Sequence, residues 1–396
     1  MIIKRMLKAV VRRVLWFFSL LLPIKKNRIV FISYYGRGYG DNPKYICEAL
    51  RDKGYDLLWL VKNEKEAKSL PSGVKGVKYG FGAIFYIATS AVWVNNCRSD
   101  FIFKKKSQLY IQTWHGGGAQ KRCEADVIEK LSRSYLKMAR RDSIHTDIMI
   151  SESRFMTNLY HKSFWYKGYV LECGYPRYDI LLGDTSKYKK KVCEYFNLNE
   201  DYEFVLYAPT FRADFSFGAY NIDFDRIINA IEKRFNKKFI MLVHLHPNVA
   251  SVEGGIIYND KVINSTAYPD MQELMAASAL LIGDYSSVNY DFCLKKQPVF
   301  RFVSDLDEYL NDRDTYFSFD KYPYPYAKNN DELEGLILNF NEESYNMSLR
   351  AFFKKLGALM NSGSSMQIAN LIDEYLAIKN KKKLFLKYSN ILKGYK

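Results

Sequence analysis

The six cysteines of this 396-residue chain include no Cys-x-x-Cys pair. That spacing is typical of zinc sites, and a disulfide framework needs a short chain dense in cysteine. The cysteines are instead scattered at positions 47, 97, 123, 173, 193 and 293. We therefore expect free thiols in a reducing cytosolic compartment. No carboxylate pair or His/Asp cluster has the spacing of metal ligands either, so we expect no bound metal and no cofactor.

Long apolar runs are also missing. The only near-continuous one covers residues 14–22, and a helix needs about 20 apolar residues to cross a bilayer. A basic segment precedes this run, as in a signal peptide, but Pro23 and Lys25-Lys26 follow where a small-residue cleavage site would stand. Residues 1–27 instead interleave cations with Leu, Phe and Trp. This pattern predicts an amphipathic helix lying in the interface of an anionic membrane surface.

Acidic residues are missing from both ends of the chain. Residues 1–28 hold eight basic residues and residues 376–396 hold seven, so 44 basic and 43 acidic residues remain for the body. The net charge of +16 thus lies in the two ends, which argues against a nucleic-acid partner. The basic tail, residues 376–396, is either a second membrane contact or a solvated terminus.

Between these ends, strand-like and helix-like patterns alternate, which is typical of parallel sheets covered on both faces. The expected strands are residues 28–34, 56–61, 91–95, 109–113, 147–150, 169–173, 203–207, 239–243, 279–283 and 298–302. The length allows two domains, and the charged stretch 184–201 is the expected boundary. We therefore predict Rossmann-like α/β domains at residues 28–190 and 200–375. The loop Gly36-x-Gly38-x-Gly40 is not the dinucleotide-binding fingerprint, because its third glycine comes too early.

The segment Gln112–Arg122 combines the most chemistry. His115 follows a predicted strand and precedes Gly116, Gly117 and Gly118, and then Lys121 and Arg122. Imidazole can move a proton near neutral pH, and glycines let the backbone approach an anion closely. The segment either forms a base beside a phosphate-binding loop or is a plain glycine turn with a satisfied histidine.

Other polar residues also follow predicted strands, where ligands bind in open α/β sheets. They are Arg177, Pro209, Thr210, Arg212, His244, His246, Asp284, Ser286 and Ser287. Ser286 and Ser287 precede a predicted helix at 288–292, whose start would attract anions. Arg212 suits a phosphate, and Asp284 suits either the loop or a ligand hydroxyl.

In these motifs the chain resembles the CDP-glycerol glycerophosphotransferase family, which primes and polymerises teichoic acids and related capsular polymers in bacteria. The matching segments are Gln112-Thr113-Trp114-His115-Gly116, Gly174-x-Pro176-Arg177-x-Asp179, Tyr207-Ala208-Pro209-Thr210-x-Arg212, His246-Pro247 and Asp284-Tyr285-Ser286-Ser287-Val288. They keep the family's order across residues 28–375. Gly117-Gly118 depart from it, because Thr-Pro or Ser-Pro commonly stands there, which puts the acceptor and the donor in question.

The resemblance implies a GT-B fold, in which two Rossmann-like domains face a central cleft. It implies that the enzyme moves glycerol phosphate or a related polyol phosphate from a CDP-linked donor to a hydroxyl of a lipid-linked glycan acceptor. The work would take place on the cytoplasmic face of the bacterial membrane, with the protein bound peripherally.

The resemblance also assigns roles to residues. His115 would be the base and His246 would lie near the donor phosphates. Arg212, Pro209, Thr210, Asp284, Ser286 and Ser287 would bind the donor, while Gly116, Gly117, Gly118 and Arg177 would line the acceptor side. Two other readings stay open: a nucleotide-sugar glycosyltransferase of the same fold, and a non-catalytic membrane adaptor.

Overall fold

The computed structural model describes residues 2–101, 103–118, 120–210, 221–245, 256–312, 314–378 and 380–393. Arg212 and His246, which the sequence assigns to the donor side, lie outside these residues. Within the described part, the strands form two sheets in which every pair of neighbours is parallel. The α/β prediction is confirmed.

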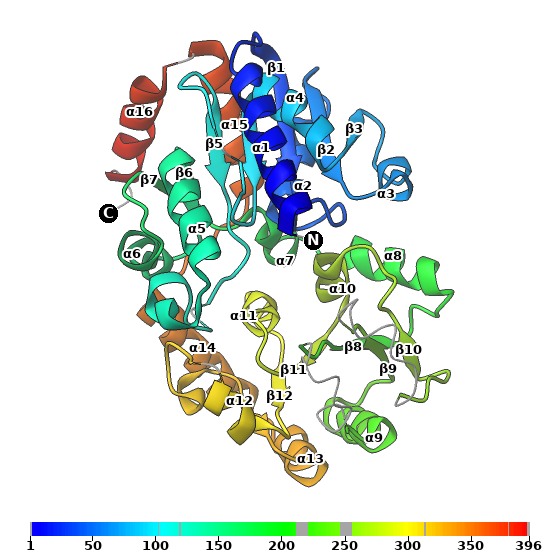
Figure 1. Cartoon of the computed structure of the whole chain (residues 1–396). Helices are drawn as coiled ribbons and strands as arrows, with labels where there is room; N and C mark the ends of the chain where they lie inside the picture. Colours follow the sequence, from blue (N-terminus) through cyan, green and yellow to red (C-terminus); the bar gives the residue numbers. More distant parts are fainter. Residues whose placement is uncertain are drawn as a thin grey trace. The chain divides into compact units, whose positions relative to one another are not determined.

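The first sheet has seven strands in the order β3-β2-β1-β4-β5-β6-β7 (Figure 1). In chain order these are β1 (Lys25–Ile32), β2 (Asp56–Val61), β3 (Val74–Lys78), β4 (Ser90–Asn95), β5 (Leu109–Gln112), β6 (Ile148–Ser151) and β7 (Tyr169–Glu172). The strand order reverses between β1 and β4. In open parallel sheets, ligands bind outside the carboxyl ends of the strands at such a reversal.

The described helices that belong with this sheet include short 3-10 segments. They are α1 (Ile2–Ser19), α2 (Asp41–Leu50), α3 (Glu64–Lys68), α4 (Phe81–Thr89), η1 (Glu124–Lys130), α5 (Arg133–His145), α6 (Arg154–Ser163), η2 (Pro176–Tyr178), α15 (Ser364–Ile378) and α16 (Lys381–Lys393). Serine side chains start two of them: Ser132 accepts from the Tyr135 amide and Ser153 from the Met156 amide.

The second sheet has the order β10-β9-β8-β11-β12-β13 and reverses between β8 and β11. Its strands are β8 (Glu203–Tyr207), β9 (Phe239–Val243), β10 (Val262–Asn264), β11 (Leu280–Gly283), β12 (Val299–Phe302) and β13 (Tyr326–Ala327). Its described helices are α8 (Ser186–Phe196), α9 (Phe224–Phe235), α10 (Met271–Ala277), α11 (Val288–Cys293), α12 (Leu306–Asp312), η4 (Phe319–Lys321), α13 (Asn330–Leu338) and α14 (Glu342–Leu356), and α7 (Asp179–Leu182) spans the change from one unit to the other.

The contacts group the chain differently from the predicted domain boundaries. One unit holds residues 1–115, 123–179 and 363–396, and the other holds 116–122 and 180–362. The stretch 184–201, expected as a linker, contains α8, which packs on α10 in the second unit. Residues 363–375 return to the first unit because the Asp179 carboxylate accepts hydrogen bonds from the amides of Gly363, Ser364 and Ser365.

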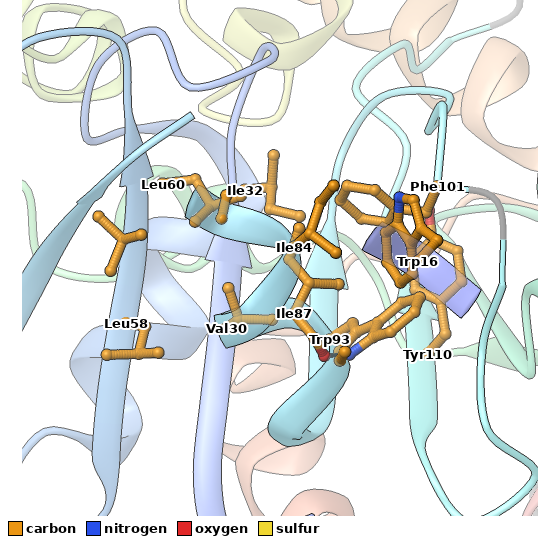
Figure 2. Packing of buried hydrophobic residues seen from close by; sticks show 13 residues of the cluster. Trp16, Val30, Ile32, Leu58, Leu60, Ile84, Ile87, Trp93, Phe101 and Tyr110 are labelled. Carbon is orange, nitrogen blue, oxygen red and sulfur yellow. Dashed lines mark hydrogen bonds between the residues drawn. The ribbon is translucent and has the colours of Figure 1, made fainter. Parts of the chain in front are cut away.

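The amino-terminal helix α1 is docked on the first unit rather than free. Trp16 is 1% exposed and lies in a cluster with Ile84, Trp93 and Phe101, as Figure 2 shows. The sequence placed Trp16 on the membrane side of the helix, and this is wrong. Arg12 adds an ion pair with Asp100. None of the described helices is both long enough and apolar enough to cross a membrane.

The opposite face of α1, with the turn that follows it, remains exposed. Its apolar side chains recur at helical spacing and form what we call the apolar stripe: Val10, Val14, Phe17, Phe18 and Leu21. Phe17 is 61% exposed and Phe18 is 58% exposed. Single exposed apolar residues are ordinary, but a contiguous row of them marks an interaction surface.

The basic tail also folds back. Lys381–Lys393 form α16, whose Leu384 and Tyr388 are buried and whose Phe385 stacks on Tyr169 of β7. Lys381 pairs with Asp147 at 2.7 Å, and Lys387 pairs with Glu374 at 2.8 Å. The tail is therefore a packed helix, and part of its charge is compensated within the first unit.

Candidate active site

His115 lies three residues beyond the end of β5, in the first unit. Its Nδ1 is 2.7 Å from the Asn96 carbonyl oxygen, which can only accept a hydrogen bond. Nδ1 therefore carries the proton, and Nε2 keeps its lone pair. Burial lowers the pKa of His115, so the ring is neutral at pH 7. The geometry leaves Nε2 able to accept a proton.

Arg177 fixes the backbone that carries His115. The Arg177 side chain is 2% exposed, and its Nη1 donates to the His115 carbonyl oxygen at 2.8 Å. The same Nη1 lies 3.2 Å from Asp41 Oδ1, and the Tyr34 hydroxyl donates to the same carboxylate. Asn42 adds a second brace, because its Nδ2 donates to the Trp114 carbonyl at 3.0 Å. The loops after β1, β4 and β7 thus hold the histidine.

The same loops contain unusual backbone. Tyr34, Tyr35, Asp41 and Trp114 have φ values of 42°, 59°, 58° and 56°, a region that residues other than glycine rarely adopt. Such conformations cost about 1–3 kcal/mol each and cluster at functional sites, where the surrounding structure enforces them. Here they accompany the loops after β1 and β5, beside the point where the strand order reverses.

Cys97 also lies near the imidazole, with its Sγ 3.7 Å from His115 Nδ1. Burial raises the pKa of the Cys97 thiol to about 12. Cys97 therefore stays protonated at neutral pH and is no nucleophile, because the thiolate is the reactive form.

In the second unit, Asp284 ties together the loops after β8 and β11. Its Oδ2 accepts from the Thr210 amide at 2.8 Å and from the Thr210 hydroxyl at 2.6 Å. Asn289 Nδ2 donates to the Asp284 carbonyl at 2.8 Å. These loops leave the sheet at its reversal point, so Asp284 and Thr210 shape the place where the topology expects a ligand.

Ser286 and Ser287 follow Asp284 in the same loop, and both are partly exposed. Ser286 Oγ accepts from the Val288 amide at 3.3 Å, and Ser287 precedes α11, close to the helix predicted at 288–292. Pro209 is buried beside Thr210. His244, at the end of β9, has its Nδ1 2.8 Å from the Ser265 carbonyl oxygen and so donates to it.

The glycines after His115 group with the second unit. Gly116–Arg122 is held there by Lys121, which bridges to Thr315, and by Gln120, which contacts Tyr322 and Tyr324. Gly118 has φ 67°, and a Cβ there would lie 2.2 Å from Tyr290 Cγ. Close packing on Tyr290 therefore requires glycine at this position.

Sequence reasoning missed Asp41, Tyr34 and Asn96. The signal for Asp41 was its place after Gly40 at the start of a predicted helix, because an acid in the first turn complements the helix dipole. Asn96 contacts His115 through its carbonyl oxygen, which no side-chain pattern indicates, and its side-chain Oδ1 accepts from the Tyr34 amide at 2.9 Å.

Comparison with known proteins agrees with this architecture. A model of the family described as CDP-Glycerol:Poly(glycerophosphate) glycerophosphotransferase matches residues 14–374. The chain belongs to that family. The match spans both sheets and therefore both groups of strand-end residues described above.

Among relatives of this glycerophosphotransferase family, the teichoic acid poly(glycerol phosphate) polymerase of Staphylococcus epidermidis is 29% identical over 88% of this chain and 51% of its own length. The corresponding polymerase of Bacillus spizizenii is 28% identical over 88% of this chain and 92% of its own. The chain thus spans about half the length of the first relative and nearly all of the second.

Solved structures of the wall teichoic acid polymerase TagF share the fold. One is 27% identical, with a TM-score of 0.80 over 94% of this chain and 97% of that chain. A histidine variant soaked with CDPG is 28% identical, with a TM-score of 0.80 over 92% and 93%. The protein therefore has the two-sheet, GT-B-like α/β fold of TagF.

Proposed function

We propose that this chain transfers glycerol phosphate from CDP-glycerol to a hydroxyl of a lipid-linked acceptor, in the synthesis of teichoic acid or a related capsular polymer. The observation that carries the proposal is the His115 hydrogen bond to Asn96, which leaves Nε2 as a base in a chain of this family. The CDPG-soaked TagF structure supports the choice of donor.

In the proposed reaction, His115 Nε2 takes the proton of the acceptor hydroxyl. The acceptor oxygen bonds to the β-phosphorus of the donor, and the bond from that phosphorus to the bridging oxygen breaks. CMP leaves with the bridging oxygen, and the imidazolium returns its proton to water. A positioned general base typically contributes about 10²–10⁴-fold to such a step.

The remaining residues divide between the substrates. Arg177 and Asp41 position His115 and act on the reaction through it. Ser286, Ser287, Thr210 and Pro209 bind the donor, and Asp284 holds their two loops. Arg212 and His246 stabilise charge on the donor phosphates, and Gly116, Gly117 and Gly118 shape the acceptor side.

A donor screen tests this function. Purified protein with a lipid-linked acceptor should release CMP from CDP-glycerol much faster than it releases the nucleotide product from CDP-ribitol, UDP-sugars or CDP-sugars. Faster release from CDP-ribitol would identify ribitol phosphate as the transferred group. Turnover of a nucleotide sugar alone would identify the chain as a glycosyltransferase. Absence of nucleotide binding in calorimetry would contradict enzymatic function altogether.

The protein works at the cytoplasmic membrane face, which it meets through the apolar stripe and nearby cations. Arg13 on α1 and Lys25 and Lys26, which follow the helix in the chain, are exposed, and each cation near an anionic surface contributes about 1 kcal/mol. Because Trp16 docks α1 on the first unit, the stripe is presented on a fixed helix, and deleting residues 1–24 would also remove a core residue.

The double variant Phe17→Ser/Phe18→Ser should therefore weaken binding to vesicles of anionic lipid by about a hundredfold or more, since burying each Phe contributes roughly 1.5–3 kcal/mol. Vesicle sedimentation measures this loss. The matched control is Ile144→Ser/Met366→Ser, which removes exposed apolar side chains elsewhere on the same unit. Equal binding by both double variants would show that the stripe is not the contact.

A further inference from the structure

A second feature lies beside the docked face of α1. A cavity of about 530 Å³ is bounded by α1, α4, α5 and the segment around Asp100. Its inner wall is apolar and includes Trp16, Ile84, Ile87 and Phe101. These four side chains belong to the cluster shown in Figure 2, and the first three of them lie on helices. Its polar lining contains three arginines, Arg12, Arg13 and Arg141.

The arginines that line this cavity carry more charge than its acidic lining neutralises. Asp100 is the one acid among the described residues that line it, and it already pairs with Arg12 and accepts from the Tyr79 hydroxyl at 3.0 Å. Within the described residues, neither Arg13 nor Arg141 forms an ion pair, although Arg141 Nη2 donates to the Asp100 carbonyl at 3.3 Å. Two guanidinium groups thus remain for an external anion.

Hydrogen-bond donors are also left over. Trp16 Nε1 and Arg141 Nε are buried and have no hydrogen-bond partner among the residues that the structure describes, and both side chains line the cavity. Buried donors without partners are uncommon in native proteins, and each one costs free energy until an acceptor fills the place. Burial also lowers the pKa of Arg141, and the nearby carboxylate of Asp100 offsets this only in part.

The cavity adjoins the apolar stripe. Arg13 precedes Phe17 by four residues and follows Val10 by three, so these side chains are neighbours on the surface of α1. Phe81, at the start of α4, lines the cavity and is itself 45% exposed. An anion held by Arg13 and Arg141 would therefore have hydrocarbon surface directly beside it.

We propose that this cavity binds the phosphate group of a membrane lipid, with Arg13 and Arg141 holding the phosphate and the lipid chain lying along the apolar stripe. Guanidinium groups suit phosphate oxygens, and an apolar surface next to them suits the attached chain. The site would fix the depth and orientation of the first unit at the bilayer. This inference rests on the proposed membrane association, but it does not depend on the donor.

The phosphate ester has two sources, a bilayer phospholipid and the lipid anchor of the acceptor. The test is calorimetry of the full chain with two soluble probes, dihexanoylphosphatidylglycerol below its micelle concentration and farnesyl diphosphate. Both should bind, and tighter binding of the diphosphate would assign the site to the acceptor anchor. Glycerol 3-phosphate and an uncharged alkyl glycoside, which supply only the head or only a chain, should bind far more weakly.

The variant Arg13→Gln/Arg141→Gln should weaken binding of both lipid probes by about tenfold or more, because charge-assisted hydrogen bonds are the strong ones. The control Lys65→Gln/Lys68→Gln removes the same charge from exposed positions on α3 and should bind as wild type. The proposal is overturned if the control loses as much affinity, if the arginine variant loses none, or if glycerol 3-phosphate binds as tightly as the lipid. CMP release by the wild-type protein, measured without added lipid probe, tests the proposed function separately. Loss of probe binding with normal CMP release would therefore count against this site and not against the proposed function.

Discussion

Replacing His115 with alanine should lower kcat by about 10²–10⁴-fold, the usual contribution of a positioned general base. The unfolding free energy should fall by about 1–3 kcal/mol, because the variant leaves the buried Asn96 carbonyl without this donor and removes ring contacts with Trp114 and Tyr34. CMP release at saturating CDP-glycerol measures the first quantity, and chemical denaturation measures the second.

His161 offers a matched control for this substitution. Its Nδ1 also lies within hydrogen-bond distance of a backbone carbonyl, that of Tyr166 at 3.2 Å, but in α6 rather than at a strand end. His161→Ala should keep wild-type kcat. Retention of near wild-type kcat by His115→Ala would remove His115 from the mechanism.

The pH profile gives an independent readout of the same residue. A general base must be unprotonated, and burial lowers the pKa of His115 below its ordinary value of about 6.5. Activity should therefore fall only as the pH drops through a pKa below about 6.5, and the alanine variant should lose this acid limb. An acid limb that persists unchanged in His115→Ala would assign it to another group.

Replacing Arg177 with methionine should cost about 3–5 kcal/mol of unfolding free energy, because it leaves the Asp41 carboxylate buried without its counter-charge. It should also lower kcat, since the His115 carbonyl loses the donor that holds its loop. Urea denaturation and CMP release measure the two effects.

Two further variants separate the ion pair from general damage. Asp41→Asn/Arg177→Met should recover about 1–3 kcal/mol relative to Arg177→Met alone, because residues in direct contact are coupled. Arg154→Met removes an arginine whose side chain is 54% exposed and pairs with Glu172 at 3.2 Å, so it should cost less than about 1 kcal/mol. An Arg177→Met cost equal to that of Arg154→Met would contradict the account.

Much of this fold follows from local pattern. Apolar runs such as residues 203–207 and 239–243 predict buried strands directly, and the alternation with helices predicts parallel sheets. The position of His115 after β5 follows in the same way. By contrast, β10 and β13 have three and two residues, too few for an apolar pattern to stand out.

The partners of His115 could not be predicted because the local sequence pattern does not determine the order of the strands in the sheet. Asp41 lies 136 residues before Arg177 in the chain, and only the order β1-β4-β5 brings the loop after β1 to the histidine. The burial of Trp16 likewise could not be predicted from the sequence pattern of its helix. An amphipathic pattern identifies apolar residues, but α1 has two apolar faces, and only packing decides which one is buried.

The central claim is that His115 activates an acceptor hydroxyl toward CDP-glycerol. The most direct measurement follows radiolabelled glycerol from CDP-glycerol into the lipid phase while CMP is counted in the same reaction. We expect one labelled glycerol to be transferred for each CMP that the wild-type protein releases, with both rates reduced about 10²–10⁴-fold together in His115→Ala. CMP release without label in the acceptor, or label transfer unaffected in His115→Ala, would contradict it.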